Sequence, residues 1–423
     1  MIRRLPLQLR LATRNVRRQT RRSILTASAM VLGVAVLVFS RALGDGAHED
    51  WIAQGVRLGK GHIAIQHPHF QRSRHLDDRL TPEALALADA ALADSAVAAR
   101  VVAVAPRLEI QGLANSATGA VPVFIDGVDP TIEATFSRLG DRVVEGRYLE
   151  PGDRLHAFVG QRLAERLDLE VGGRLVLTGQ DATGEIAGQF VRVVGVFRTG
   201  LPEADEGIIH IPLATAQEWL GVGGAVTTLA VLLESGWVVS ETLHRLETLL
   251  AEDAGEVTVL GWREAMPELD AAIRIDDYGD YVFHVILFLI VGLAIVNTVL
   301  MSVLYRTREF GVLRALGLTR GETAGVVFAE GVLLTFISGV LGMVLGFVVT
   351  WVFFRNGLDY SGLLDNEFTF SGVVLEPVIV PTFRVVQVLQ SLGSILIIGV
   401  LASLYPAYRA TRIDVAEAMK FEA

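Results

Sequence analysis

The chain has 423 residues, of which 51% are hydrophobic, 20% are charged and none is cysteine, and its length predicts roughly two to three domains. This composition excludes a disordered chain, disulfides, thiolate metal sites and cysteine nucleophiles. The net charge of −10 is uneven, because residues 44–278 hold 36 acidic and 19 basic residues while residues 1–22 hold eight arginines and no acid. Nucleic-acid binding needs a clustered basic face on a folded domain, so no nucleic-acid partner is expected.

Four uncharged apolar runs are long enough to cross a membrane. They predict spans at residues 23–43, 281–305, 325–354 and 385–408. The first run follows an arginine-rich segment, which is also typical of a signal peptide, but it is longer than a signal-peptide core and no A-x-A-like cleavage site follows it. Glu330, in the third span, is expected to be interfacial or paired with an arginine of the neighbouring loop.

The flanking charges predict the topology by the positive-inside rule. Basic residues gather in three segments: residues 1–22, the loop 306–322 and the tail 409–423. The loop 355–384 is acidic instead, as is the block 44–278. Both termini are therefore expected in the cytoplasm, and both acidic segments outside it. Residues 1–22 are expected to form an amphipathic entry helix.

The outer block 44–278 is expected to be an α+β domain of two subdomains. Expected helices cover residues 81–99, 161–167, 238–250 and 263–275; expected strands cover residues 101–104, 107–113, 120–125, 157–159, 174–177, 189–197, 227–233 and 256–260. The late strand–helix–strand pattern predicts a βαβ-like unit. A mostly β insert is expected at about residues 105–225, between early and late segments that form an α/β subdomain.

Several catalytic motifs are missing from the sequence. Lys60 and Lys420 are the only lysines, and neither stands in a G-x-x-x-x-G-K-[ST] loop. The chain is therefore expected to be non-catalytic, to hydrolyse no ATP with a P-loop of its own and to hold no cofactor. Four histidines lie close in sequence, at positions 62, 67, 69 and 75. Strand alternation places His62 and His67 on opposite faces, so no metal site is expected there.

The loop after the second span carries the strongest functional signal. Its apolar residues alternate with charges at helical spacing, which predicts a short amphipathic cytoplasmic helix that Gly317 ends. The residues expected to contact a partner protein are Arg306, Arg308, Glu309, Phe310, Leu313, Arg314, Leu316 and Gly317. Leu313 and Leu316 are expected to share one face that fills an apolar groove of the partner.

Residues 297–317, NTVLMSVLYRTREFGVLRALG, resemble the signature of the FtsX/MacB-type permeases of ABC transporters. Residues 405–419, YPAYRATRIDVAEAM, resemble the family's closing motif, with Met419 where leucine is usual. The entry segment 11–26 and the outer motifs GHIAI (61–65), GVDP (127–130) and GRYLEPGD (146–153) are also similar to the family. The resemblance covers nearly the whole chain and is closest to the lipoprotein-releasing (Lol) group.

The resemblance implies a bacterial inner-membrane protein with a MacB-like periplasmic domain. It implies a dimer with a second copy or a paralogue, contact with membrane lipid, and an ABC ATPase subunit docked on residues 306–322 as a coupling helix. It also implies that ATP hydrolysis drives movements of the periplasmic domain. The favoured function is release of lipoproteins from the inner membrane. The alternatives are export of a peptide, antibiotic or other amphiphile through an adaptor, FtsX-like regulation of cell-wall hydrolases, or an uncoupled membrane anchor.

Overall fold

The computed structural model describes residues 20–412 except 201, 254, 360–368, 371–372 and 375–377. The entry segment 1–19 and the tail 413–423, including the last seven residues of the closing motif, lie outside the described residues. The chain divides into two units. The helical unit comprises Met1–His48, Ile275–Tyr360 and Pro377–Ala423, and the sheet unit comprises Glu49–Arg274 and Ser361–Glu376.

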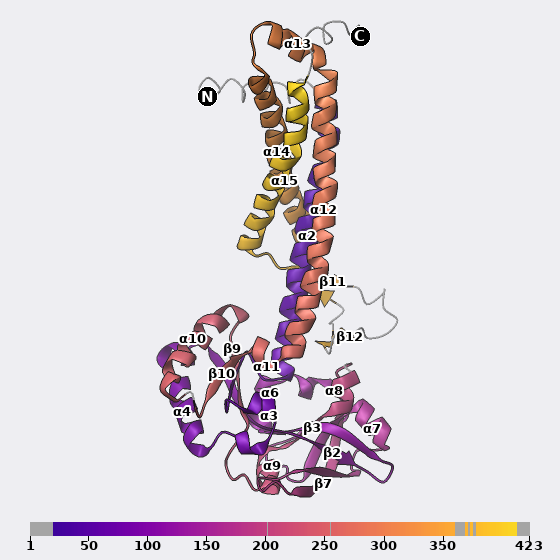
Figure 1. Cartoon of the computed structure of the whole chain (residues 1–423). Helices are drawn as coiled ribbons and strands as arrows, with labels where there is room; N and C mark the ends of the chain where they lie inside the picture. The colour runs from indigo at the N-terminus through magenta and orange to yellow at the C-terminus, as the bar shows by residue number, and fades with distance from the viewer. Residues whose placement is uncertain are drawn as a thin grey trace. The chain divides into compact units, whose positions relative to one another are not determined.

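Four helices long and apolar enough to cross a membrane dominate the helical unit, and each expected span lies within one of them (Figure 1). They are α2 (Thr20–Leu58), α12 (Pro267–Tyr305), α14 (Arg320–Phe354) and α15 (Val385–Thr411). The short helix α13 (Thr307–Ala315) joins α12 to α14, and strands β11 (Leu358–Asp359) and β14 (Val378–Ile379) pair between α14 and α15. The four-span fold class expected from the sequence is confirmed.

Small residues bring these helices together inside one chain. A Cβ added to Gly342 of α14 would lie 2.6 Å from the Val34 Cβ of α2, and one on Gly399 of α15 would lie 2.4 Å from the Thr335 Cγ2 of α14. At Gly33, an added Cβ would lie 2.9 Å from the Val291 side chain of α12. These glycines therefore serve packing within the chain, as small residues do where lipid supplies no hydrophobic driving force between helices.

The sheet unit is built on one ten-stranded mixed sheet in the order β10-β1-β9-β2-β3-β8-β5-β7-β4, with β6 paired to β2 and β7. Its strands are β1 (Ile63–Gln66), β2 (Val101–Asn115), β3 (Ala120–Val128), β4 (Val143–Gly146), β5 (His156–Gly160), β6 (Arg174–Gln180), β7 (Ile186–Phe197), β8 (Ile208–Pro212), β9 (Thr228–Leu233) and β10 (Thr258–Gly261). A separate hairpin is formed by β12 (Thr369–Phe370) and β13 (Val373–Val374).

Short helices connect these strands. They are α3 (Phe70–Ser73), η2 (Leu76–Asp78), α4 (Pro82–Leu92), α5 (Ser95–Ala98), α6 (Pro130–Phe136), η3 (Leu139–Arg142), α7 (Gln161–Leu167), α8 (Pro202–Gly207), α9 (Leu213–Leu220), η4 (Gly236–Val238), α10 (Val239–Leu249), η5 (Ala251–Asp253) and α11 (Trp262–Ala265). Helix α7 has the bounds that the sequence predicted. Strand β8 and helices α6 and α9 were not anticipated.

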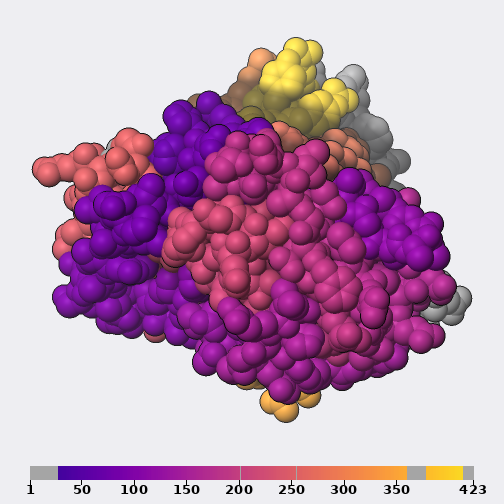
Figure 2. Space-filling view, turned by 90° about the horizontal axis from the view of Figure 1, so that it is seen from below, coloured from indigo at the N-terminus to yellow at the C-terminus, as the bar shows by residue number. Residues whose placement is uncertain are grey.

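The expected βαβ-like unit is present in a split form. Strands β9 and β10 both pair antiparallel with β1, which therefore lies between them. The helix α10 connects β9 to β10 along the chain. Figure 2 shows one face of the surface, on which a salmon segment from late in the chain lies beside indigo and magenta segments from earlier in it.

Two expected strands, at residues 101–104 and 107–113, are one strand, so that prediction was wrong. Strand β2 pairs with β9 along its first half and with β3 from Arg107 onward. Pro106 does not interrupt it. The Arg107 carbonyl accepts a hydrogen bond from the Thr227 N–H, at 2.9 Å, on the β9 side. The Pro106 nitrogen therefore faces the opposite side, before β3 begins to pair, and no ladder hydrogen bond is lost.

Two predicted helices are also divided in the structure. The helix predicted at residues 81–99 is broken between α4 and α5, because the Asp94 carboxylate accepts the Ala96 N–H at 3.2 Å and caps a new helix. The helix predicted at residues 263–275 is broken before Pro267, which begins α12. Pro267 lacks the N–H that would continue α11, and it favours a first helical turn.

Candidate functional site

Helix α13 has well-defined ends. Gly317 follows it with φ +107°, a conformation that favours glycine, and its N–H donates to the Arg314 carbonyl at 3.1 Å. The Leu318 N–H donates to the Leu313 carbonyl at 3.1 Å, which completes a Schellman motif. Thr319 then caps α14 in a capping box with Glu322. These paired ends fix where α13 stops and α14 starts, and they confirm Gly317 as the helix stop.

One face of α13 is buried against the membrane helices of its own chain. Phe310 is 1% exposed and lies in a cluster with residues of α12, α14 and α15. The Arg306 guanidinium lies over the Phe310 ring at 5.0 Å. It also donates to Glu309 of α13 at 2.9 Å and to Glu330 of α14 at 2.8 Å. Arg306 therefore ties α12, α13 and α14 together, and Glu330 has the arginine partner considered from the sequence.

The opposite face of α13 is exposed. Arg308 and Val312 are exposed, and Leu316 just past the helix end is 77% exposed. Leu313 instead packs, partly buried, against the cluster that contains Phe310. Leu313 and Leu316 therefore differ in their surroundings, and their shared docking face stays a prediction. Val312 is an exposed apolar residue that was not among the expected contacts. We call Arg308, Val312, Ala315 and Leu316 the exposed face of α13.

The residues expected to contact a partner thus differ in how far they are exposed to solvent. Arg308, Glu309 and Leu316 are open to solvent, with the Glu309 carboxylate also held by Arg306. Arg306 and Phe310 face inward, so they position α13 rather than offer a surface. Arg314 is partly buried and interacts with other groups of the chain. Sequence periodicity located α13. The helix is too short for its periodicity to show which of its faces packs against the other helices of the chain.

The four clustered histidines are separated by their surroundings. His62 is buried, and its Nδ1 accepts the Leu233 N–H at 3.2 Å. Burial, with a smaller effect of Arg57, lowers the pKa of His62 to about 4, so it is neutral. His67 lies 3.3 Å from an Asp78 oxygen. Within the described part of the chain, no group of three or more His, Asp or Glu side chains is arranged to hold a metal ion.

A buried cluster of charges in the sheet unit was not anticipated. Arg107 and Glu133 are almost fully buried and lie 2.5 Å apart, and Arg107 also donates to the Gly59 carbonyl at 2.6 Å. Lys60 and Arg74 both lie within 3.3 Å of Glu109. The cluster joins α6, β2 and the segment that follows α2. In a sequence these residues look like ordinary surface charges, so no local signal could have identified them.

A cavity of about 420 Å³ borders this cluster, lined in part by Lys60, Arg107, Glu109, Phe124 and Asp126. Burial and then the negative charge of Glu109 raise the pKa of Asp126 to about 7. His210 lies 3.9 Å from the Asp126 carboxylate, and burial lowers the pKa of His210 to about 3, so it contributes no compensating charge. Asp126 is therefore an acid whose charge changes near neutral pH.

Family models match most of the chain in two adjacent segments. A MacB-like periplasmic core domain matches residues 23–249, more than half of the chain, and an FtsX-like permease C-terminal domain matches residues 281–415. The second match contains α13, α14, α15 and the apolar part of α12 from residue 281 onward. The two models therefore correspond to the sheet-bearing and the helical parts of the sequence.

Curated relatives of this kind are similar over nearly the whole sequence. The chain is 26% identical to the lipoprotein-releasing system transmembrane protein LolC of Xylella fastidiosa (strain Temecula1), over 99% of both chains. It is 24% identical to the macrolide export ATP-binding/permease protein MacB of Nitrobacter winogradskyi, over 94% of this chain and 58% of that protein. The extracellular domain of the Gram-positive transporter YknZ is 17% identical, with a TM-score of 0.33, over 47% of this chain and 99% of that one.

These matches agree with the fold. The four apolar helices fit an inner-membrane protein, and the matched periplasmic core fits a large domain outside the cytoplasm. The MacB relative is longer than this chain, which spans about three fifths of it. The chain belongs to the FtsX-like permeases with a MacB-like periplasmic core domain, and it is an ABC transporter permease of the FtsX, MacB and LolC kind.

Proposed function

We propose that this permease is the transmembrane subunit of an ATP-driven system that releases lipoproteins from the inner membrane. The observation that carries this proposal is the similarity to a lipoprotein-releasing transmembrane protein over 99% of both chains. In this proposal a separate ATPase subunit binds ATP and Mg. A second copy or a paralogue completes a dimer, and the lipidated substrate enters from the membrane.

The proposed docking surface for the ATPase is the exposed face of α13. Val312 and Leu316 offer apolar contacts, and Arg308 offers a charge at the rim. Apolar anchors that become desolvated dominate most interfaces, whereas rim charges are screened by water. Arg306 and Phe310 support this surface from inside, because they attach α13 to α12 and α14. A movement of α13 would therefore be transmitted to both helices.

The test is a pull-down of the ATPase encoded beside this gene, together with a release assay in spheroplasts. Leu316→Asp should abolish capture of the ATPase, because it places a charge in the apolar contact. Val144→Asp is the matched control, since Val144 is an exposed valine of β4 in the sheet unit and should leave capture unchanged. Capture of the ATPase by Leu316→Asp at the wild-type level would show that α13 is not the docking helix.

Substrate identity is tested separately. A radiolabelled lipoprotein should leave spheroplasts only when this chain, the ATPase and a soluble acceptor are all present. Export of a macrolide or a peptide without lipoprotein release would favour the second candidate. The similarity to a macrolide export protein over 94% of this chain supports that alternative.

A further inference from the structure

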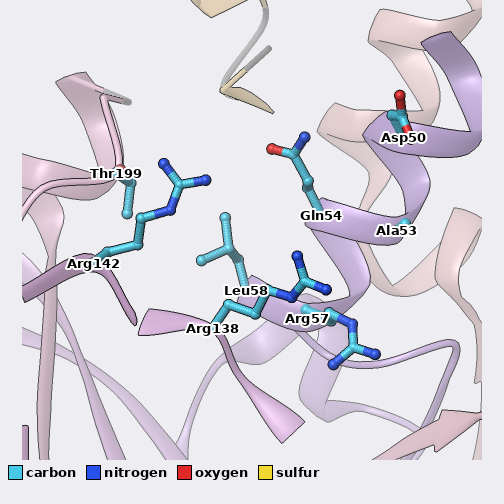
Figure 3. A pocket seen from close by; sticks show the side chains of 8 residues that line it. All are labelled: Asp50, Ala53, Gln54, Arg57, Leu58, Arg138, Arg142 and Thr199. Carbon is cyan, nitrogen blue, oxygen red and sulfur yellow. The ribbon is translucent and has the colours of Figure 1, made fainter. Parts of the chain in front are cut away.

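A second cavity in the sheet unit is rich in arginine. It has a volume of about 200 Å³ and is lined by Asp50, Ala53, Gln54, Arg57, Leu58, Arg138, Arg142 and Thr199. The lining comes from the last turns of α2 and from the two ends of η3, together with the residue that follows β7 by two positions. In Figure 3, Arg142 and Thr199 lie on one side of the space and Gln54 of α2 on the other, with the Leu58 side chain between them and the Arg138 guanidinium below Gln54, beside Arg57.

The three arginines of this cavity are not paired with a carboxylate of the described residues. Among the described residues, no Asp or Glu oxygen lies within 4 Å of a guanidinium nitrogen of Arg57, Arg138 or Arg142. Elsewhere in the same unit arginines are commonly paired, such as Arg147 with Asp153 at 2.7 Å. Asp50 is the single acid of the lining and interacts with other groups of the chain. The lining therefore carries an excess of two positive charges.

The backbone that presents two of these arginines is held firmly. Leu139, between Arg138 and Arg142, is buried in a cluster that includes Phe158 and Phe197, and Leu58 of α2 packs against the same cluster. The Ser137 hydroxyl accepts the Leu139 N–H at 3.1 Å and so fixes the start of η3. The core therefore holds the segments that carry Arg57, Arg138 and Arg142 beside one cavity, where a bound anion would be attracted to all three.

Other groups of the lining define what can enter. The Thr199 hydroxyl and N–H both donate to Asp205 at 2.7 Å, so that wall offers no free donor. The Gln54 amide has no hydrogen-bond partner among the described residues and can donate to a ligand. Arg57 is in the last turn of α2, where the helix dipole favours a cation. The helix dipole accounts for the position of Arg57, but it does not account for Arg138 and Arg142 at the two ends of η3.

We propose that this cavity binds a phosphate group. A phosphate offers several oxygens and one to two negative charges, which matches three guanidinium groups and an amide better than a single carboxylate does. The phosphate can come from a soluble phosphate compound or from the headgroup of an anionic phospholipid such as phosphatidylglycerol. The proposal does not depend on which substrate the transporter moves.

The experiment uses the full chain purified in detergent and titrated with inorganic phosphate by isothermal calorimetry. The Arg138→Gln/Arg142→Gln double variant should raise the dissociation constant at least tenfold, because two charge-assisted contacts are lost. Arg142→Lys keeps the charge but not the planar fork, so it should bind with an intermediate constant. Arg162→Gln is the matched control, since Arg162 is exposed on α7 and does not line the cavity.

A second arm identifies the source of the phosphate. The chain is placed in nanodiscs of phosphatidylcholine with or without phosphatidylglycerol, and the lipids that stay bound are measured by native mass spectrometry. Retention of phosphatidylglycerol that is lost in the double variant assigns the site to a lipid headgroup, whereas binding of inorganic phosphate alone assigns it to a soluble compound. Binding of neither overturns the proposal, as does binding that the double variant leaves unchanged while its thermal midpoint matches the wild type. Equal weakening by Arg162→Gln also overturns it.

Discussion

The two units of this permease exclude water from their interiors by different means. The helical unit packs through glycine and small residues, and its Arg306–Glu330 ion pair joins the residue that follows α12 to the third turn of α14. The sheet unit places charges inside its core, where Arg107 and Glu133 are 2% and 1% exposed. Lipid offers no hydration to a misplaced charge, so close backbone contact specifies helix pairs. In the sheet unit, the opposite charges of Arg107 and Glu133 offset the cost of burying either one where α6 packs beside β2.

The largest expected effect comes from breaking the buried pair of the sheet unit. Arg107→Met should destabilise that unit by on the order of 4 kcal/mol, because it leaves the Glu133 carboxylate buried and unpaired. Denaturant unfolding of the full chain in detergent, followed by hydrogen exchange of the β2 amides, measures the effect. Adding Glu133→Leu should restore part of the lost stability.

The control for that variant is an exposed pair. Nitrogen and oxygen atoms of Arg245 and Asp94 lie 2.9 Å apart at the surface, where water screens the charges, so Arg245→Met should cost much less stability than Arg107→Met. If Arg107→Met and Arg245→Met lowered the free energy of unfolding by similar amounts, burial of the Arg107–Glu133 pair would not make its loss more destabilising.

The next effect concerns the packing of the helical unit. Gly342→Val places side-chain atoms where the Val34 side chain and the Val31 carbonyl of α2 now lie, and should destabilise the unit by on the order of 3 kcal/mol. The thermal midpoint of the purified chain reports the loss. Gly393→Val on α15 is the control, because an added Cβ there meets no atom within 4 Å. An unchanged midpoint for Gly342→Val would contradict the close approach of α2 and α14.

A smaller effect depends on pH. The pKa of Asp126 is about 7 in the folded chain and 3.8 as its ordinary value, so the folded state holds the proton more tightly. The stability that this carboxyl contributes is complete below pH 3.8 and is lost as the pH rises through 7. Asp126→Asn should therefore stabilise the chain by on the order of 2 kcal/mol more at pH 8 than at pH 5.

The stability contributed by Asp181 should depend on pH in the opposite direction to that of Asp126. Hydrogen bonds from Thr183 and the neighbouring backbone lower the pKa of Asp181, so its stabilising contribution is present above pH 3.8 and is lost in acid. Asp181→Asn should therefore lower stability at neutral pH and matter less in acid. Denaturant midpoints at pH 2.5, 5 and 8 separate the two variants, because Asp181→Asn should lower the midpoint equally at pH 5 and 8 and less at pH 2.5, whereas the effect of Asp126→Asn should change between pH 5 and 8. If the denaturant midpoints of Asp126→Asn and the wild type changed with pH in the same way, the raised pKa of Asp126 would be refuted.

The smallest effect should appear in coupling rather than folding. Arg306→Gln removes the charge that joins α13 to Glu330, so the proposed ATPase should still bind but be stimulated several-fold less. Glu330→Gln should act in the same direction, and the double variant should be no worse than Arg306→Gln, which already removes the contact with Glu330 along with those to Glu309 and the Phe310 ring. ATPase turnover in reconstituted vesicles measures this. Full stimulation in Arg306→Gln would show that the pair is not needed for transmission.

The sequence predicts a structural feature when that feature depends on residues close together in the chain. Runs of about 20 apolar residues identify spans because hydrocarbon admits only backbone that satisfies its own hydrogen bonds. A glycine after a periodic segment identifies the end of α13 because a positive φ favours glycine at that position. These features depend on neighbours in the chain, so the sequence alone determined the four spans, the short helix and the family resemblance.

Only the tertiary structure decided the rest. Strand β1 lies between β9 and β10, which come more than 160 residues later, and no local pattern encodes that pairing. Leu313 and Leu316 are equivalent in sequence, yet one packs against the cluster around Phe310 and the other is exposed. Arg107, Asp126 and Arg138 look like surface charges until distant segments bury or gather them. Their roles depend on contacts between segments far apart in the chain, and hydrophobic periodicity does not specify those contacts.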